Sequence, residues 1–285
     1  MVIKSSLIIS FSILILMACN DKKEVIDPST DSPTITSQLI DNYEQLPEQE
    51  IVTSADQHVY AQYAEPTERY GHGVLGDKIE AGQLVVVVDC VFYELTLASD
   101  YVFEDISPRI YDVDGDNELE FITIRTHVTQ GAGIAIYKII NDELVEYAFV
   151  PEIGSANRWL NIVAINDLDN DGFVELVWIQ TPHIGGVLKV AKIEPGTLQV
   201  LDAIIQFSNH TIGERNLCLS VLTEQLNQKI FYVPNQNKTK IVGFTFSNNA
   251  FNMFEEIPKG VDFSQSLDVQ HGFSNIIESG NNCMR

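Results

Sequence analysis

Basic residues are scarce in this chain of 285 residues, which has 17 Lys and Arg against 40 Asp and Glu and a formal net charge of −23. Such a surface repels nucleic acid and anionic lipid headgroups, so we expect neither as a partner. The chain also lacks the Gly-x-Ser-x-Gly, His-Glu-x-x-His and phosphate-loop motifs. No long segment has a convincing helical period. The sequence therefore favours a strand-rich protein without a recognisable catalytic motif.

The apolar segment at the N-terminus is too short to cross a membrane comfortably. Residues 1–18 contain one early cation, Lys4, and then Leu, Ile, Phe and Ser, as is typical of a secretory signal peptide. The segment ends in Leu16-Met17-Ala18-Cys19, which resembles a bacterial lipobox. The resemblance implies a lipid on Cys19 after cleavage, and an ordinary signal with an incidental Cys is the alternative. Asn20 at the next position favours the outer membrane over the inner one.

Residues 19–50 are rich in Asp, Glu, Ser, Thr and Pro and have no sustained apolar period. This composition predicts a flexible, lipidated tether. The tether would hold residues 51–285 in the periplasm or at the cell surface, with the lipid as the only membrane contact. The remaining length suffices for one all-β domain with a sizeable core, which we expect to be monomeric.

Two acidic loops stand out in the middle of the chain. The first runs Asp112-Val113-Asp114-Gly115-Asp116-Asn117-Glu118-Leu119-Glu120, and the second runs Asp167-Leu168-Asp169-Asn170-Asp171-Gly172-Phe173-Val174-Glu175. Both place carboxylates at positions 1, 3, 5 and 9, both contain a glycine that permits a tight curl, and both lead into an apolar segment. They start 55 residues apart, which indicates an internal repeat.

The spacing of these acids favours a cation site. Two carboxylates held about 4 Å apart repel by roughly 4 kcal/mol at an effective dielectric of about 20, and a divalent cation relieves that repulsion. A nest of oxygens suits calcium. An EF-hand is excluded, because its twelfth position must be Glu and is Thr123 or Trp178 here. The remaining alternative is a solvated acidic turn, since Asp, Asn and Gly also favour turns.

The two loops resemble the calcium loops of FG-GAP or VCBS repeats, which build the β-propellers of integrin α-chain heads and of many bacterial secreted proteins. The resemblance implies one calcium loop per full-length blade, with side-chain ligands at positions 1, 3, 5 and 9 and a backbone carbonyl at position 7. The implied ligands of two calcium ions are Asp112, Asp114, Asp116, the carbonyl of Glu118 and Glu120, and then Asp167, Asp169, Asp171, the carbonyl of Phe173 and Glu175.

Twelve short apolar segments between residues 84 and 246, such as 120–125, 174–180 and 217–222, predict strands. Their spacing divides the domain into units of about residues 55–98, 99–153, 154–207 and 208–258, with a partial unit at 259–285. The fourth unit has Thr223-Glu224-Gln225-Leu226-Asn227 at the loop position in place of alternating acids, so we expect no calcium there. The long period favours an all-β propeller of five blades whose terminal strands share a blade. Four blades and a two-sheet sandwich are the alternatives.

Cysteines are few, and after lipidation of Cys19 three remain in an oxidising compartment. An odd number leaves one unpaired within the chain. We expect a bridge between Cys218 and Cys283 that fastens the C-terminal tail, with Cys90 buried as a small apolar residue. A bridge between Cys90 and Cys283 is the alternative.

Several basic and aromatic residues precede or follow glycine turns at similar places in their units. They could surround one mouth of a central channel and bind a ligand there, although blade-edge residues with backbone hydrogen bonds would look the same. These candidates are Arg69, His72, Arg158, Trp159, His183 and His210.

Three functions of different classes are compatible with these features. The leading hypothesis is a non-catalytic, calcium-stabilised binding module of the cell envelope whose ligand is a protein or a glycan. The second is a carbohydrate-active enzyme of the polysaccharide lyase or sugar dehydratase type, with His72, His183 or His210 as base beside Arg158. The third is a structural subunit of an envelope complex.

Overall fold

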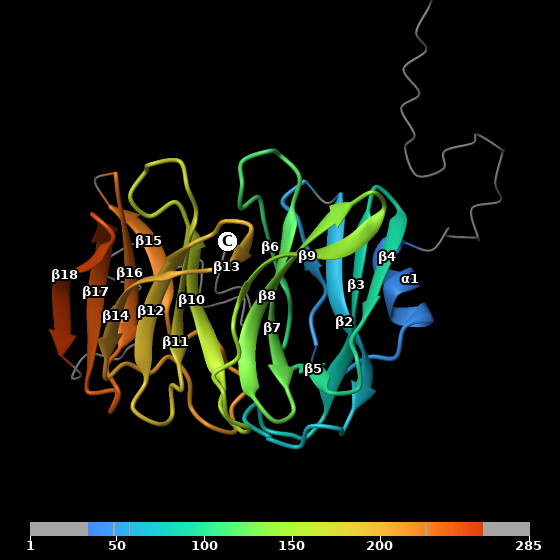
Figure 1. Cartoon of the computed structure of the whole chain (residues 1–285), viewed down its shortest axis with the longest axis horizontal. Helices are drawn as coiled ribbons and strands as arrows, with labels where there is room; N and C mark the ends of the chain where they lie inside the picture. The colour runs from blue at the N-terminus through green and yellow to red at the C-terminus, as the bar shows by residue number, and fades with distance from the viewer. Residues whose placement is uncertain (1–33, 48, 57, 226, 259–285) are drawn as a thin grey trace, which may run out of the picture.

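The computed structural model describes residues 34–258 except residues 48, 57 and 226 (Figure 1). The described part is all-β apart from one short helix, which confirms the all-β part of the predicted fold. The predicted signal peptide, Cys19, Cys283 and the predicted partial unit at 259–285 lie outside the described residues. In the described ranges, no helix has the length and hydropathy that a membrane span requires.

The elements follow one another in a simple order along the chain. They are α1 (Ile35–Asn42), β1 (Val52–Thr53), β2 (Val59–Thr67), β3 (Glu80–Val88), β4 (Val91–Thr96), β5 (Tyr101–Phe103), β6 (Arg109–Tyr111), β7 (Glu120–His127), β8 (Gly131–Ile140), β9 (Glu143–Val150), β10 (Leu160–Asn166), β11 (Glu175–Gln180), β12 (Val187–Lys192), β13 (Gly196–Thr197), β14 (Val200–Ile205), β15 (Val221–Gln225), β16 (Gln228–Pro234), β17 (Lys240–Ser247) and β18 (Ala250–Pro258).

These strands form one large sheet and two small ones. The large sheet has ten strands in the order β1-β2-β3-β5-β7-β8-β9-β13, with β4 on β3 and β6 on β7. The small sheets have four strands each, in the orders β10-β11-β12-β14 and β15-β16-β17-β18. The pairs within each small sheet are antiparallel. The strands of the second small sheet are consecutive in the chain, whereas the first is interrupted by β13, which pairs with β9 of the large sheet.

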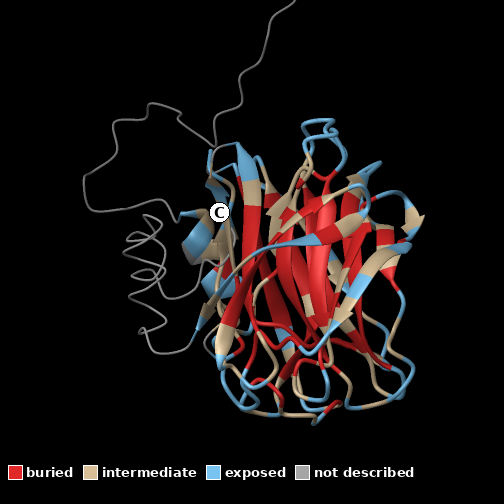
Figure 2. Cartoon of the chain, turned by 90° about the vertical axis from the view of Figure 1, so that its left-hand side faces the viewer, coloured by how far each residue is buried: buried red, intermediate tan, exposed pale blue. Residues whose placement is uncertain are grey.

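The sheets are stacked face to face. One apolar cluster lies between β7–β8 and β10–β12, a second between β10–β12 and β16–β18, and a third between β2–β3 and β7–β8. Strands β8 and β11 are therefore buried on both faces, which explains their nearly unbroken apolar sequences. The outer strand β14 instead alternates between exposed and partly buried residues. In Figure 2 the buried strands fill the middle of the molecule and the exposed loops lie at the two edges of the sheets.

Helix α1 lies within the segment predicted to be a flexible tether. That prediction is wrong from residue 34 onward, because Ile35, Leu39 and Tyr43 recur every four residues and so share one helix face. Leu39 is 0% exposed and packs with Val85 and Val87 of β3. The helix therefore belongs to the folded domain and covers the outer face of the first sheet (Figure 1).

The predicted strands leave out β2 and β18. Both carry polar residues that weaken the apolar pattern: β18 is mostly exposed, and β2 contains the buried Gln62. The predicted strand at 217–222 starts too early, because the side chain of Asn216 accepts a hydrogen bond from the Cys218 amide (2.8 Å) and forms a turn there. The first two predicted units are also joined, since Ala81 of β3 pairs with Phe103 of β5.

Both cysteines in the described ranges, Cys90 and Cys218, are disulfide-bonded. The prediction that Cys90 remains a buried free thiol is therefore wrong, and Cys90 is only half-buried in the turn between β3 and β4. A turn at a sheet edge leaves its side chains accessible, so a cysteine there can reach a partner outside the sheet. The pairing of Cys218 with Cys283 stays a prediction, because Cys283 lies outside the described residues.

Candidate functional site

The two acidic loops occupy the same edge of neighbouring units, where one connects β6 to β7 and the other connects β10 to β11 (Figure 1). Positions 4 and 6 of both loops have positive φ: 74° at Gly115 and 69° at Asn117, and 59° at Asn170 and 89° at Gly172. Glycine and asparagine are the residues that tolerate this backbone region best. The loops therefore share one backbone path, although they use these two residues in opposite order.

Two sets of hydrogen bonds hold each loop closed. The first carboxylate of each loop accepts bonds from backbone amides of later loop residues, such as Gly115 to Asp112 (2.7 Å) and Gly172 to Asp167 (3.0 Å). At the end of the loop, the position 9 glutamate accepts a bond from the amide at position 2. This distance is 2.7 Å both for Val113 to Glu120 and for Leu168 to Glu175.

Three of the predicted side-chain ligands converge in each loop. Carboxylate oxygens of Asp112, Asp114 and Glu120 lie within 4.8 Å of one another, and so do those of Asp167, Asp169 and Glu175. The position 5 acids, Asp116 and Asp171, are outside these groups and accept hydrogen bonds from the amides of Glu118 (2.8 Å) and Phe173 (3.0 Å). Glu118 and Phe173 are exposed, and the ligand role of their carbonyls stays a prediction.

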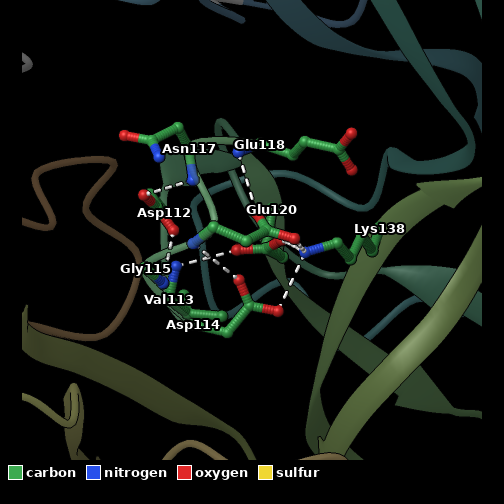
Figure 3. Close-up of polar contacts among 9 residues, drawn as sticks. Asp112, Val113, Asp114, Gly115, Asn117, Glu118, Glu120 and Lys138 are labelled. Carbon is green, nitrogen blue, oxygen red and sulfur yellow. Dashed lines mark hydrogen bonds and ion pairs between the residues drawn. The ribbon is translucent and has the colours of Figure 1, made fainter.

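A lysine from the neighbouring strand points into the first loop (Figure 3). The Nζ atom of Lys138 lies 2.8 Å from Asp114, 2.7 Å from Asp116 and 2.7 Å from Glu120. Burial lowers the pKa of this lysine, but the three carboxylates outweigh that effect and raise it. Lys138 therefore supplies a positive charge where the carboxylates converge.

Lys192 occupies the corresponding place beside the second loop but contacts fewer acids. Its Nζ atom bonds the Asp171 carboxylate and lies 3.8 Å from Oε1 of Glu175. That oxygen and Oδ1 of Asp169 are buried without any hydrogen-bond donor. Burial first, and then the nearby Asp169 and Asp171, raise the pKa of Glu175 to about 7 although the Leu168 amide lowers it. A hard cation fits this set of unpaired oxygens.

The opposite edge of the sheets carries a cluster of aromatic rings, Trp159, His183 and His210. The His183 ring is stacked on Trp159 at 6.1 Å between centroids, and the His210 ring lies 4.8 Å from Trp159. Nε2 of His210 must donate to the Glu214 carbonyl (2.7 Å), because a carbonyl can only accept. Nδ1 of a neutral His210 then accepts from Nε2 of His183 (2.8 Å), which leaves Nδ1 of His183 without a proton.

Burial lowers the pKa of both His183 and His210 to about 4. The neighbouring His210 and Lys238 lower the pKa of His183 further. The hydrogen bond of His210 to the Glu214 carbonyl raises the pKa of His210, whereas Lys238 lowers it. Both rings are therefore neutral at physiological pH. A proton on Nδ1 of His210 would remove the acceptor of the hydrogen bond that joins the two rings.

His72 joins this cluster through Glu104. Nδ1 of His72 lies 2.6 Å from a Glu104 oxygen, and the Glu104 side chain is fully buried. Thr126 donates to the second oxygen of Glu104 (2.9 Å), while Nε1 of Trp159 donates to its backbone carbonyl (2.9 Å). Burial raises the pKa of Glu104, against the opposing effects of His72 and Thr126. Glu104 thus orients His72 and anchors Trp159 at the same time.

The remaining two predicted mouth residues have other partners. Nε of Arg69 donates to the Tyr101 carbonyl (2.8 Å), and Arg158 donates to the carbonyl of the adjacent Asn157 (3.0 Å) on the exposed surface. Sequence analysis did not identify Glu104, Lys138 or Lys192 as site residues. The two lysines could have been found, because each follows the first aspartate of its loop by nearly the same distance, 26 and 25 residues. Glu104 has no comparable signal in the sequence.

Comparisons with known proteins assign no family to this chain. No protein-family model and no curated protein matches it. Among solved structures, the chain is similar to a Bacteroides fragilis protein described as a "putative 6-phosphogluconolactonase", with a TM-score of 0.34 and 10% sequence identity over 75% of this chain and 72% of that one. A similarity at this level carries no argument about fold or activity. The geometry of the two edges is therefore the basis for a functional proposal.

Proposed function

We propose that this protein is a lipid-anchored, calcium-stabilised β-propeller of the bacterial envelope that binds a protein or a glycan without catalysing a reaction. The observation that carries the calcium proposal is the repeated acidic loop, with one backbone path and one buried glutamate in two successive units. A solvated turn would not need a buried carboxylate. Oxygen atoms of three acids within 4.8 Å, two of them unpaired in the second loop, suit a divalent cation.

The propeller proposal rests on the form of the sheets. The third and fourth units are four-stranded antiparallel sheets, and apolar faces join them to each other and to the large sheet. Such units are typical of propeller blades. Five blades remain our proposal and four the alternative, since residues 259–285, which would complete a ring, lie outside the described part of the chain.

The ligand-binding role is proposed for the edge that carries Trp159, His183 and His210. Loops at one edge of a rigid β-scaffold are common places for binding residues. Trp159 and His210 are buried and hold His183 in place, whereas His183 is partly exposed and its unprotonated Nδ1 can accept a hydrogen bond from a sugar hydroxyl or a peptide amide. A lipid on Cys19, in the lipobox-like sequence, would tether the domain to the membrane.

Calcium stabilisation can be tested by melting the full chain in EDTA and in excess calcium, with magnesium at equal ionic strength as the control. A ligand at about 100 times its Kd adds about 2.7 kcal/mol, which for a domain of this size raises the Tm by about 5 to 10 °C. We expect calcium to raise the Tm of the wild type by this amount and to leave the Tm of the double variant D114A/D169A unchanged. An unchanged Tm would refute the calcium proposal.

Ligand binding can be tested on arrays of envelope glycans and purified envelope proteins. We expect His183→Gln to weaken the binding of any specific ligand at least tenfold, while the control His58→Gln, at an exposed site on the other edge, leaves it unchanged. Equal binding by the two variants would place the ligand elsewhere.

A carbohydrate-active enzyme is the second candidate, and the contact between His72 and Glu104 is the specific observation that favours it. A buried carboxylate 2.6 Å from Nδ1 fixes the imidazole so that Nε2 can accept a proton from a substrate. Incubation with a panel of acidic and neutral polysaccharides, read by the ultraviolet absorbance of unsaturated products, tests this candidate. Activity that is lost in His72→Gln and kept in His58→Gln would favour the enzyme over the non-catalytic module.

A further inference from the structure

The two acidic loops share a backbone path and differ in the positive charge that the protein supplies to them. In the first loop, Nζ of Lys138 donates hydrogen bonds to Asp114 (2.8 Å) and Asp116 (2.7 Å) and forms an ion pair with Oε1 of Glu120 at 2.7 Å. The Lys138 side chain is only 8% exposed, so water does not compete for these contacts. The carboxylates of Asp114 and Glu120 are thus already neutralised by an ammonium group.

The second loop keeps its central oxygens free. Lys192 bonds Asp171 at the exposed margin and lies over the ring of Phe173 at 5.3 Å, while Oε1 of Glu175 is 3.8 Å away. Another lysine, Lys229, donates to the backbone carbonyl of Asp167 and not to its carboxylate. Glu175 is 0% exposed, and its Oε1 atom has no hydrogen-bond donor. Oε1 of Glu120 also has none, but it lies 2.7 Å from the Lys138 ammonium, against 3.8 Å between Glu175 and Lys192. A buried carboxylate oxygen without a donor is costly unless a cation joins it.

We propose that calcium binds in the loop of residues 167–175 alone, and that the ammonium of Lys138 replaces the ion in the loop of residues 112–120. This proposal rests on the proposed calcium function and specifies which site performs it. Calcium cannot enter the first loop without breaking two charge-assisted hydrogen bonds and the ion pair with Glu120, because Asp114 and Glu120 would have to exchange one cation for the other. In the second loop, calcium meets oxygens that have no partner to give up.

The number of bound ions tests the proposal directly, by equilibrium dialysis of the full chain against calcium and by titration calorimetry. We expect one ion per wild-type chain, none in Asp169→Asn and one in the matched variant Asp114→Asn. Lys138→Met should bind two ions, because it frees the carboxylates of the first loop. Lys192→Met should still bind one ion, with an affinity raised about tenfold by the loss of a nearby positive charge.

The outcomes separate this proposal from the calcium proposal itself. Two ions in the wild type, with one lost in each aspartate variant, would overturn the lysine replacement and leave calcium binding intact. Loss of the single ion in Asp114→Asn, with its retention in Asp169→Asn, would overturn the choice of loop. No ion in the wild type or in Lys138→Met would overturn both proposals. If Lys138→Met does not fold, the wild type and the aspartate variants decide the question without it.

Discussion

The acidic edge of the stacked sheets is closed by contacts between near neighbours, whereas the histidine edge is closed by contacts between distant parts of the chain. The amide of Val113 bonds Glu120 only 7 residues away, and Leu168 bonds Glu175 at the same separation. At the other edge, Trp159 bonds the carbonyl of Glu104 across 55 residues. The comparison teaches that local bonds shape each loop of the acidic edge, although Lys229 also reaches Asp167 there from the next unit, whereas distant bonds fasten the units together at the histidine edge.

The largest effect should follow from breaking the histidine edge at its centre. Trp159 is 2% exposed and contacts both histidine rings and the Glu104 carbonyl. We expect Trp159→Ala to lower the free energy of unfolding by about 3 to 5 kcal/mol, measured by urea denaturation. The control on the acidic edge is Phe173→Ala, which removes a 53% exposed ring and should cost about 0.5 kcal/mol. Similar losses would show that the two edges do not differ in this way.

The second prediction compares the two acidic loops through the free energy of unfolding, measured in EDTA so that no calcium is bound. Glu120→Gln removes a charged partner of Lys138 from a buried site and should lower the free energy of unfolding by about 1 to 3 kcal/mol. Glu175→Gln keeps an acceptor for the Leu168 amide and removes an unpaired buried charge, so we expect no loss and a gain of up to about 1 kcal/mol. Changes of the same sign and size would mean that Lys138 does not distinguish the loops.

The third prediction concerns pH and the histidine edge. The pKa values of His183 and His210 are lowered to about 4 in the folded protein, against about 6.5 in an unfolded chain. Between these values the unfolded chain binds protons that the folded chain does not, so stability falls as the pH drops through this window. The double variant H183Q/H210Q should remove about 1 to 2 kcal/mol of this pH dependence, measured by urea denaturation between about pH 7 and pH 4.5. Equal slopes in both proteins would contradict the lowered pKa values.

The smallest effect is expected from exchanging the two turn residues of the first loop. Gly115→Asn with Asn117→Gly recreates the order of the second loop, and a Cβ atom at Gly115 would meet nothing within 4 Å. We expect the free energy of unfolding to change by less than about 0.5 kcal/mol. Gly115→Val is the matched contrast and should cost about 1 to 2 kcal/mol, since a β-branched residue resists positive φ. If the exchange proves as costly as the valine, the two loops do not share interchangeable backbone positions.

The contrast between local and distant contacts also explains what the sequence could reveal. The acid spacing predicted the loops correctly because Asp112 and Glu120 meet through one tight turn, and the turn depends on residues within it. The role of Lys138 was missed because it depends on the pairing of β7 with β8. Glu104 could not be predicted at all, since His72 and Trp159 reach it from two other units. Helix α1 was missed because three apolar residues in a polar segment gave too weak a period.

Strand pairing places each lysine opposite the buried glutamate of its loop. Glu175 of β11 pairs directly with Lys192 of β12. In the other hairpin, Phe121 pairs with Tyr137. These residues adjoin Glu120 and Lys138. A shift of one residue in the register of either hairpin would turn the lysine to the opposite face of the sheet. The buried glutamate would then have no counter-charge. Each lysine therefore selects the correct alignment of its hairpin during folding, before any ion is bound.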